Sequence, residues 1–136
     1  MKKVHSPTIL INGGKDAPNL LQKLNDDPSL VEIIKNADII IGESAGAKIL
    51  CDRQRIGFPE ETKIVKWLGI LHDTIISPHY IELSRQSILQ KDMADMHVHY
   101  GIGIDSSTGI QCDPETFPTY TKIGEGVVEL KVNAKE

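Results

Sequence analysis

The sequence predicts an α/β fold with a doubly wound, mostly parallel sheet that is followed by a C-terminal β segment. Short apolar runs alternate with helix-like segments through most of the chain, as in folds where helices connect parallel strands. The run at 38–41 is continuous and β-branched, which is typical of a central strand covered on both faces. The part from 97 to 132 holds short strand candidates separated by glycines. All 136 residues are expected to form one domain, residues 1–136.

The first half of the chain has strands that each run into a turn and a helix. Apolar residues before Gly13 and Gly14 suit a buried strand that ends in a backbone turn. Leucines at helical spacing come next, and a second short helix is expected after Pro28. A strand that stops at Gly42 then precedes a run of helix formers. The expected elements are a strand at 8–12, helices at 17–24 and 29–35, a strand at 38–41 and a helix at 45–51.

The second half begins with a polar segment that contains Gly57 and Pro59. This composition predicts an exposed loop with functional side chains. An apolar run closed by Pro78 predicts another strand, and apolar residues near helical spacing predict a helix after it. The expected elements are a loop at 52–66, a strand at 74–77, a helix at 81–93 and short strands between 97 and 132.

Composition excludes several classes of protein. The formal net charge is −4 and the lysines are scattered, so no basic face for nucleic acid is expected. The N-terminal apolar run is too short for a signal peptide or a membrane span, which predicts a cytoplasmic protein with no membrane partner. Cys51 and Cys112 are expected to be reduced, buried thiols because no disulfide-dense pattern is present.

The segment Gly42–Gly46 fits the pattern G-x-S-x-G between an expected strand and an expected helix. A serine in such a turn projects its hydroxyl from the carboxyl edge of the sheet, which makes Ser44 a candidate nucleophile. The helix that follows directs free N–H groups to the same place, so the Ala45 N–H is a candidate oxyanion donor. The Gly13–Gly14 turn is the candidate source of a second donor.

A serine hydroxyl needs a base, and a histidine at the end of another strand is the expected source. His79 fits because it follows the strand at 74–77 and Pro78. A carboxylate must orient its imidazole, and Glu60 and Glu61 in the polar segment are the candidates. Arg85 and Arg53 could each pair with an acidic group of a substrate, and Arg85 is the better candidate because it follows His79 closely.

These motifs resemble peptidase E and its cyanophycinase relatives, the S51 serine peptidases, in an order that spans nearly the whole chain. The resemblance implies a flavodoxin-like, class I glutamine amidotransferase-like fold, with Ser44 as nucleophile, His79 as base and the N–H groups of Gly14 and Ala45 as oxyanion donors. It also implies an Asp or Glu as third member, and hydrolysis of short peptides next to acidic residues without metal or cofactor. The segments that carry the resemblance are 41–47 (IGESAGA), 68–71 (LGIL), 77–80 (SPHY), 11–14 (INGG), 19–21 (NLL) and 101–105 (GIGID).

The chain departs from the family pattern in two places. Lys15–Asp16 stands where the family usually has Asn-Thr after the glycine turn. The chain also resembles a family member without its N-terminal βα units, so an N-terminally truncated sheet with an exposed edge and apolar face is expected. A partner chain could complete the sheet, a homodimer could hide the face, or the chain could be a remnant of a disrupted gene. A homodimer or another form of self-association is the expected outcome.

Three other functions remain open. The chain could be a catalytically inactive, truncated family member that acts as a structural or binding protein. A glutamine amidotransferase-like activity normally needs a cysteine at the elbow, and Ser44 argues against it. His97 and His99 would share one face of a strand and could bind a metal ion, but no further ligand is evident nearby, so no metal site and no cofactor are expected.

Overall fold

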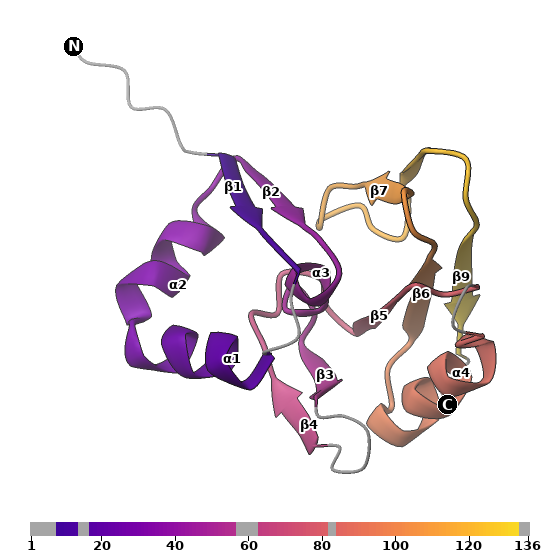
Figure 1. Cartoon of the computed structure of the whole chain (residues 1–136), viewed down its shortest axis with the longest axis horizontal. Coiled ribbons are helices and arrows are strands. Elements are labelled where there is room, and N and C mark those ends of the chain that lie inside the picture. The colour runs from indigo at the N-terminus through magenta and orange to yellow at the C-terminus, as the bar shows by residue number, and fades with distance from the viewer. Residues whose placement is uncertain (1–7, 14–16, 57–62, 82–83, 134–136) are drawn as a thin grey trace.

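The computed structural model describes residues 8–13, 17–56, 63–81 and 84–133 of the chain (Figure 1). Within these ranges the chain is a mixture of helices and strands, which places it in the α/β class. In chain order the elements are β1 (Thr8–Ile11), α1 (Ala17–Asp26), α2 (Pro28–Lys35), β2 (Ile39–Gly42), α3 (Ala45–Lys48), β3 (Arg53–Ile56), β4 (Lys63–Lys66), β5 (Thr74–Pro78), α4 (Gln86–Met96), β6 (Tyr100–Ile104), β7 (Gly109–Gln111), β8 (Thr121–Ile123) and β9 (Val128–Val132).

The described strands form several small sheets, and the expected continuous doubly wound sheet is not confirmed. β1 pairs with β2 in parallel, and β5 pairs with β6 in parallel. β9 adds to β6 in the antiparallel direction, while β3–β4 and β7–β8 are separate antiparallel pairs. The helix α3 lies against both β2 and β5, so the two parallel pairs meet through this helix.

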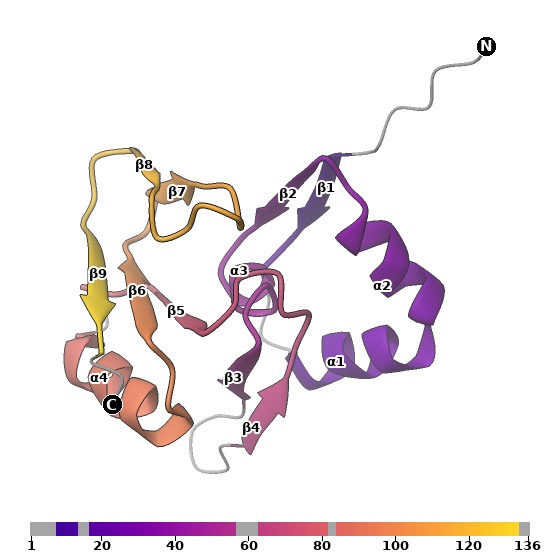
Figure 2. The same cartoon turned by 180° about the vertical axis from the view of Figure 1, so that it is seen from behind.

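One face of the β1–β2 pair is covered by α1 and α2, as both views show (Figures 1 and 2). Alternate strand residues point into this layer: Ile9, Ile11 and Ile40 pack in a cluster that also includes Leu24 and Ile34. The other face is exposed, and the large apolar side chains on it are Leu10 (58 %), Ile39 (56 %) and Ile41 (50 %). The exposed apolar face expected from the sequence is therefore present on these two strands.

The three-stranded sheet β5–β6–β9 is packed more completely. Four of the five residues of β5 are buried, and α4 covers one face of the sheet (Figure 2). A second cluster with Ile76 and Ile102 forms a separate buried core. The residues buried between β5 and α4 are Ile75, Tyr80, Leu89, Met93, Met96 and Val98.

α2 begins at Pro28, one residue before the expected start at 29. The Asp27 carboxylate caps the helix by accepting a hydrogen bond of 3.1 Å from the Leu30 N–H. Pro28 occupies the first helical position, where its missing N–H costs nothing and its fixed φ favours the helix.

The expected loop at 52–66 is wrong, because its described residues form the hairpin β3–β4. The polar residues that suggested a loop have specific partners instead. Gln54 is buried, and its side-chain oxygen accepts a hydrogen bond of 3.3 Å from the Ile76 N–H. Arg53 donates to the Met96 carbonyl at 2.8 Å, which ties the hairpin to the end of α4.

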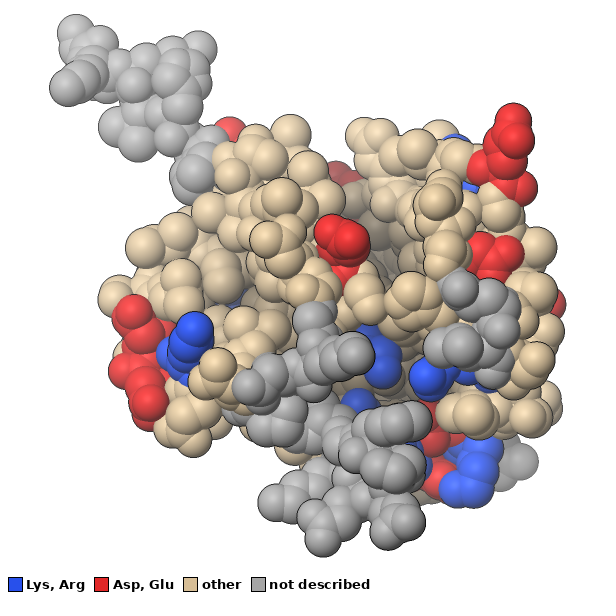
Figure 3. Space-filling view, viewed as in Figure 1, with Lys and Arg blue, Asp and Glu red and all other residues tan. Residues whose placement is uncertain are grey.

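Arg55 adds an ion-pair cluster between β3 and α4. Its guanidinium lies 3.0 Å from the Asp92 carboxylate and 3.2 Å from the Asp95 carboxylate. Asp95 also pairs with Lys91 at 2.9 Å, and the Lys91 contact is the main reason that the pKa of Asp95 is lowered. Figure 3 shows basic and acidic side chains side by side in the region of α4.

Two helix boundaries differ from the expectation. α3 ends at Lys48, because Cys51 already forms a β-bridge with Leu71. α4 runs from Gln86 to Met96 and so begins and ends later than the expected helix at 81–93. His97 ends α4 in the left-handed conformation with φ of 54°, which separates it from β6.

The two cysteines are free thiols in this structure. Cys51 is fully buried, and burial raises the pKa of its thiol well above the usual range. Cys112 is half-buried, and its pKa is raised for the same reason. Among the helices of the described residues, none has the length and apolar character that a membrane crossing requires.

Candidate active site

The candidate nucleophile Ser44 lies in the turn between β2 and α3. Its backbone has φ of 54° and ψ of −113°, a conformation that side-chain-bearing residues rarely adopt. Hydrogen bonds on both sides hold the turn: the Glu43 N–H donates to the Ile11 carbonyl at 3.0 Å, and the Gly46 N–H donates to the Glu43 carbonyl at 2.9 Å. Strained backbone of this kind persists only where the surroundings fix it, and it is common at functional sites.

Glycines allow neighbouring backbone segments to pack closely around this turn. A Cβ atom on Gly46 would lie 2.1 Å from the Ile11 carbonyl oxygen, and one on Gly42 would lie 2.6 Å from the Gly46 carbonyl oxygen. A Cβ atom on Gly13 would lie 2.9 Å from the Cβ atom of Ser44. Three glycines, one after β1, one at the end of β2 and one in α3, are thus required by packing around one serine.

The structure brings Ser44 and His79 together from two different sheets. The Ser44 Oγ lies 3.4 Å from the His79 Nε2, and both side chains are partly buried. This distance is at the long end for a hydrogen bond, as is common for catalytic pairs without bound substrate. The pair has the geometry in which an imidazole can accept the serine proton.

His79 is fixed by the chain that follows it. The Tyr80 N–H donates to the Ile104 carbonyl at 3.3 Å, and the Ile81 N–H donates to the Asp105 Oδ1 at 2.8 Å. These bonds hold residues 79–81 along the carboxyl end of β6. His79 itself has φ of 54°, so the chain turns sharply here to direct the imidazole toward the elbow.

Tyr80 anchors this turn from within the core. Its side chain is fully buried, and its hydroxyl donates a hydrogen bond to the Glu129 carboxylate on β9. Burial raises the pKa of the Tyr80 phenol well above its usual range, and the bond to Glu129 raises it further. The same bond lowers the pKa of Glu129, with a further contribution from a hydrogen bond with Lys131.

The other ring nitrogen of His79 meets a residue that the sequence analysis did not identify. The Nδ1 atom lies 3.1 Å from the Oγ of Ser106, which follows β6. The sequence gives one indication of this position, since Ser106 comes directly after the strand-like run GIGID. Residues at the carboxyl ends of adjacent parallel strands lie close together, and β5 and β6 are such a pair. Glu60 and Glu61, the expected carboxylates, lie outside the described residues.

The expected oxyanion donors are described only in part. Ala45 occupies the first position of α3, where the N–H has no acceptor within the helix. It is therefore available beside Ser44 for a developing negative charge. Gly14 lies outside the described residues, while the adjacent Gly13 contacts the elbow.

A second feature of the site is a pair of cations. Lys48, at the end of α3, has a lowered pKa, first because of burial and then because of the charge of Arg85. Arg85 precedes α4, and its buried Nε atom has no hydrogen-bond partner among the residues that the structure describes. Arg53, the other expected substrate contact, instead donates to the Met96 carbonyl at 2.8 Å.

The alternative metal site does not fit the structure. The expected strand through His97 and His99 is wrong, because His97 caps α4 and β6 begins only at Tyr100. Within the described residues, no group of three or more histidine, cysteine, aspartate or glutamate side chains could hold a metal ion.

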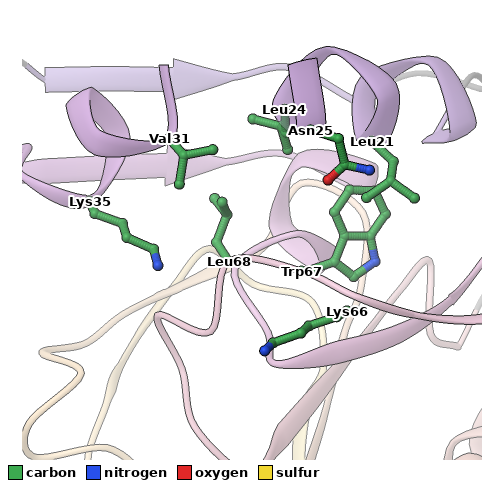
Figure 4. A pocket seen from close by; sticks show the side chains of 8 residues that line it. All are labelled: Leu21, Leu24, Asn25, Val31, Lys35, Lys66, Trp67 and Leu68. Atoms are coloured by element: carbon green, nitrogen blue, oxygen red, sulfur yellow. The ribbon is translucent and has the colours of Figure 1, made fainter. Parts of the chain in front are cut away.

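A cavity of about 230 Å³ lies away from the catalytic pair, between the two N-terminal helices and the segment after β4 (Figure 4). Neither Ser44 nor His79 lines it. Leu21, Leu24, Val31 and Leu68 form its apolar wall, and Lys35 and Lys66 are at its margin.

Comparison with known proteins identifies the family of this chain. The model of peptidase family S51 matches residues 1–119, which include Ser44, His79 and Ser106. No curated protein matches the chain.

Proposed function

The chain belongs to peptidase family S51, and from this membership we propose that it is a serine peptidase that cleaves short peptides beside an acidic residue. One observation carries the proposal: the strained elbow presents the Ser44 Oγ at 3.4 Å from the His79 Nε2. A serine and an imidazole within hydrogen-bond reach are the minimum requirement for nucleophilic acyl transfer.

In the proposed reaction, the Ser44 Oγ attacks the scissile carbonyl carbon while His79 Nε2 takes the serine proton. The negative charge that develops on the carbonyl oxygen is stabilised by the Ala45 N–H at the start of α3. The C–N bond then breaks, and the imidazolium gives its proton to the leaving amine. Water, with His79 again as base, hydrolyses the acyl-enzyme and regenerates Ser44.

The resemblance to peptidase E adds a carboxylate that orients His79, and Glu60 and Glu61 remain the proposed candidates. Substitution by glutamine keeps the shape of each side chain and removes its charge. We expect the variant of the triad acid to lose about 10²-fold or more in kcat, because an imidazolium is then left without its counter-charge. The other variant should retain its activity, and steady-state kinetics on both variants assigns the role.

Arg85 is the proposed contact for the acidic side chain of the substrate. Its position next to Lys48 supports this role, because neighbouring cations favour a bound carboxylate, and its Nε has no partner within the described part of the chain. The Arg85→Ala variant should lose its preference for aspartyl substrates while it retains activity on neutral peptides. An unchanged preference would contradict the assignment.

The test of the peptidase proposal is hydrolysis of aspartyl dipeptides and an aspartyl anilide by the purified chain. The Ser44→Ala variant is the control for contaminating peptidases. Turnover that depends on Ser44 supports the proposal, whereas a folded chain without turnover supports the alternative below.

The alternative is a catalytically inactive family member that binds a ligand or a protein. The hydroxyl of Ser106 favours it, because an uncharged group lies at Nδ1 where a serine peptidase usually has a carboxylate. In this case Ser44→Ala would not change the affinity for an aspartyl peptide. Equilibrium dialysis would measure this affinity.

A further inference from the structure

The proposed function sets a requirement on the imidazole of His79. For Nε2 to accept the Ser44 proton, the single proton of the neutral ring must reside on Nδ1. The group beside Nδ1 must therefore accept a hydrogen bond. The Ser106 Oγ lies at 3.1 Å from this atom, and a hydroxyl oxygen has lone pairs for that bond.

The turn that carries Ser106 is braced on several sides. The Asp105 carboxylate accepts hydrogen bonds from the Ile81 N–H at 2.8 Å and from the Val127 N–H at 2.9 Å. The Thr108 hydroxyl donates to the Ser106 carbonyl at 3.2 Å. The Asp105 carboxylate thus holds the turn that carries Ser106 against Ile81. This contact fixes the distance between the side chains of Ser106 and His79.

We propose that Ser106 is a positioning residue, whose Oγ accepts a hydrogen bond from the His79 Nδ1–H and holds the tautomer that leaves Nε2 free for the Ser44 proton. This inference rests on the proposed function for its kinetic consequences. The hydroxyl fixes the ring as a carboxylate would, but it carries no charge to stabilise the imidazolium.

The tautomer can be measured without any substrate. Long-range ¹H–¹⁵N spectra at about pH 8, where an imidazole is neutral, report which ring nitrogen bears the proton. We expect the Nδ1–H form of His79 in the unmodified chain and a larger share of the Nε2–H form in Ser106→Ala. Ser107→Ala is the matched control, because it makes the same change at the adjacent exposed residue. An unchanged tautomer in Ser106→Ala overturns the proposal.

Kinetics give a second readout. Ser106→Ala should lower kcat about tenfold with KM unchanged, which corresponds to the loss of one uncharged hydrogen bond. Ser106→Thr, which keeps the hydroxyl, should restore most of the rate. Ser106→Asp should raise kcat about tenfold above that of the unmodified chain, because a charge-assisted bond is about twice as strong. A Ser106→Asp variant slower than the unmodified chain would argue against the proposal.

The two proposals fail in different ways. A folded chain without turnover overturns the peptidase proposal, while the tautomer measurement still decides the role of Ser106. If Glu60→Gln or Glu61→Gln changes the tautomer and Ser106→Ala does not, a carboxylate orients His79 and the Ser106 proposal is wrong.

Discussion

Ser44 and His79 come from two sheets whose packing differs. The strand β2 that leads to Ser44 is exposed on alternate residues, and Ile39 and Ile41 are half in solvent. The strand β5 that leads to His79 is buried over four successive residues, and Tyr80 directly after His79 is fully buried. One member of the candidate catalytic pair therefore lies at the edge of a thin layer, and the other is attached to a dense core.

This difference shows two ways to hold a catalytic side chain. Both Ser44 and His79 have φ of 54°, but on the serine side close contacts of glycine backbone hold the turn. On the histidine side the turn is held by the buried side chain of Tyr80 and its bond to Glu129. Substitutions that add atoms should therefore destabilise the serine side, whereas substitutions that remove atoms should destabilise the histidine side.

The largest expected effect separates activity from stability on the serine side. Ser44→Ala should lower kcat by about 10³-fold or more, because it removes the hydroxyl that lies beside the His79 Nε2. The free energy of unfolding should change by less than about 1 kcal/mol, since the elbow is held by its backbone. Turnover of the aspartyl anilide and urea unfolding measure the two quantities. A large loss of stability would show that the serine side chain also supports the fold.

The next test adds one methyl group to the elbow. Gly46→Ala should lower the free energy of unfolding by about 3 kcal/mol, because the new Cβ would lie 2.1 Å from the Ile11 carbonyl. Gly109→Ala is the control, because a Cβ there would meet nothing within 4 Å. We expect the control to change stability by less than about 1 kcal/mol. Equal effects in urea unfolding would mean that the elbow is not held by close packing.

The local parts of this contrast could be predicted from the sequence. The elbow is encoded by neighbouring residues, so the pattern Gly42–Gly46 between an apolar run and helix formers located Ser44 in the turn after β2. The proximity of His79 to Ser44 could also be predicted, because His79 follows another apolar strand. The assignment of catalytic roles to these residues remains a prediction.

The parts that depend on tertiary contacts could not be predicted. The hairpin β3–β4 has a polar sequence because its residues bond to other elements, as Gln54 does to the Ile76 N–H. Ser106 stands beside His79 only because β5 and β6 are paired, and a single serine after a strand carries no distinguishing signal. Sequence periodicity does not report such long-range partners.

The histidine side can be weakened by the removal of one oxygen atom. Tyr80→Phe removes the bond to Glu129 from the core, and we expect a loss of about 1–2 kcal/mol in the free energy of unfolding. The kcat should fall less than in Ser44→Ala, because residues 79–81 keep their backbone bonds to β6. Urea unfolding and steady-state kinetics test both points, with Tyr120→Phe as the matched control.

The same residue predicts a pH dependence. The pKa of Tyr80 is raised in the folded state, so the unfolded state loses this proton first as the pH rises. The contribution of Tyr80 is fully present below about pH 10, the ordinary pKa of tyrosine, and decreases above it. The stability difference between the unmodified chain and Tyr80→Phe should therefore become smaller as the pH rises above about 10. A constant difference would contradict a raised pKa.

The smallest effect on the fold is expected at the exposed face of β1 and β2. We propose that a second copy of the chain covers Leu10, Ile39 and Ile41. Among the described strands, β1 pairs only with β2. An isologous contact would bury this apolar patch on both copies. Leu10→Lys should change the unfolding free energy of one chain by less than about 0.5 kcal/mol, yet weaken self-association at least about tenfold. Ile123→Lys makes the same kind of change on an exposed residue of β8 and is the control. Sedimentation velocity over a dilution series measures the association. A compact monomer at all concentrations would show that the serine side remains a thin, uncovered layer, and the proposed contact would be wrong.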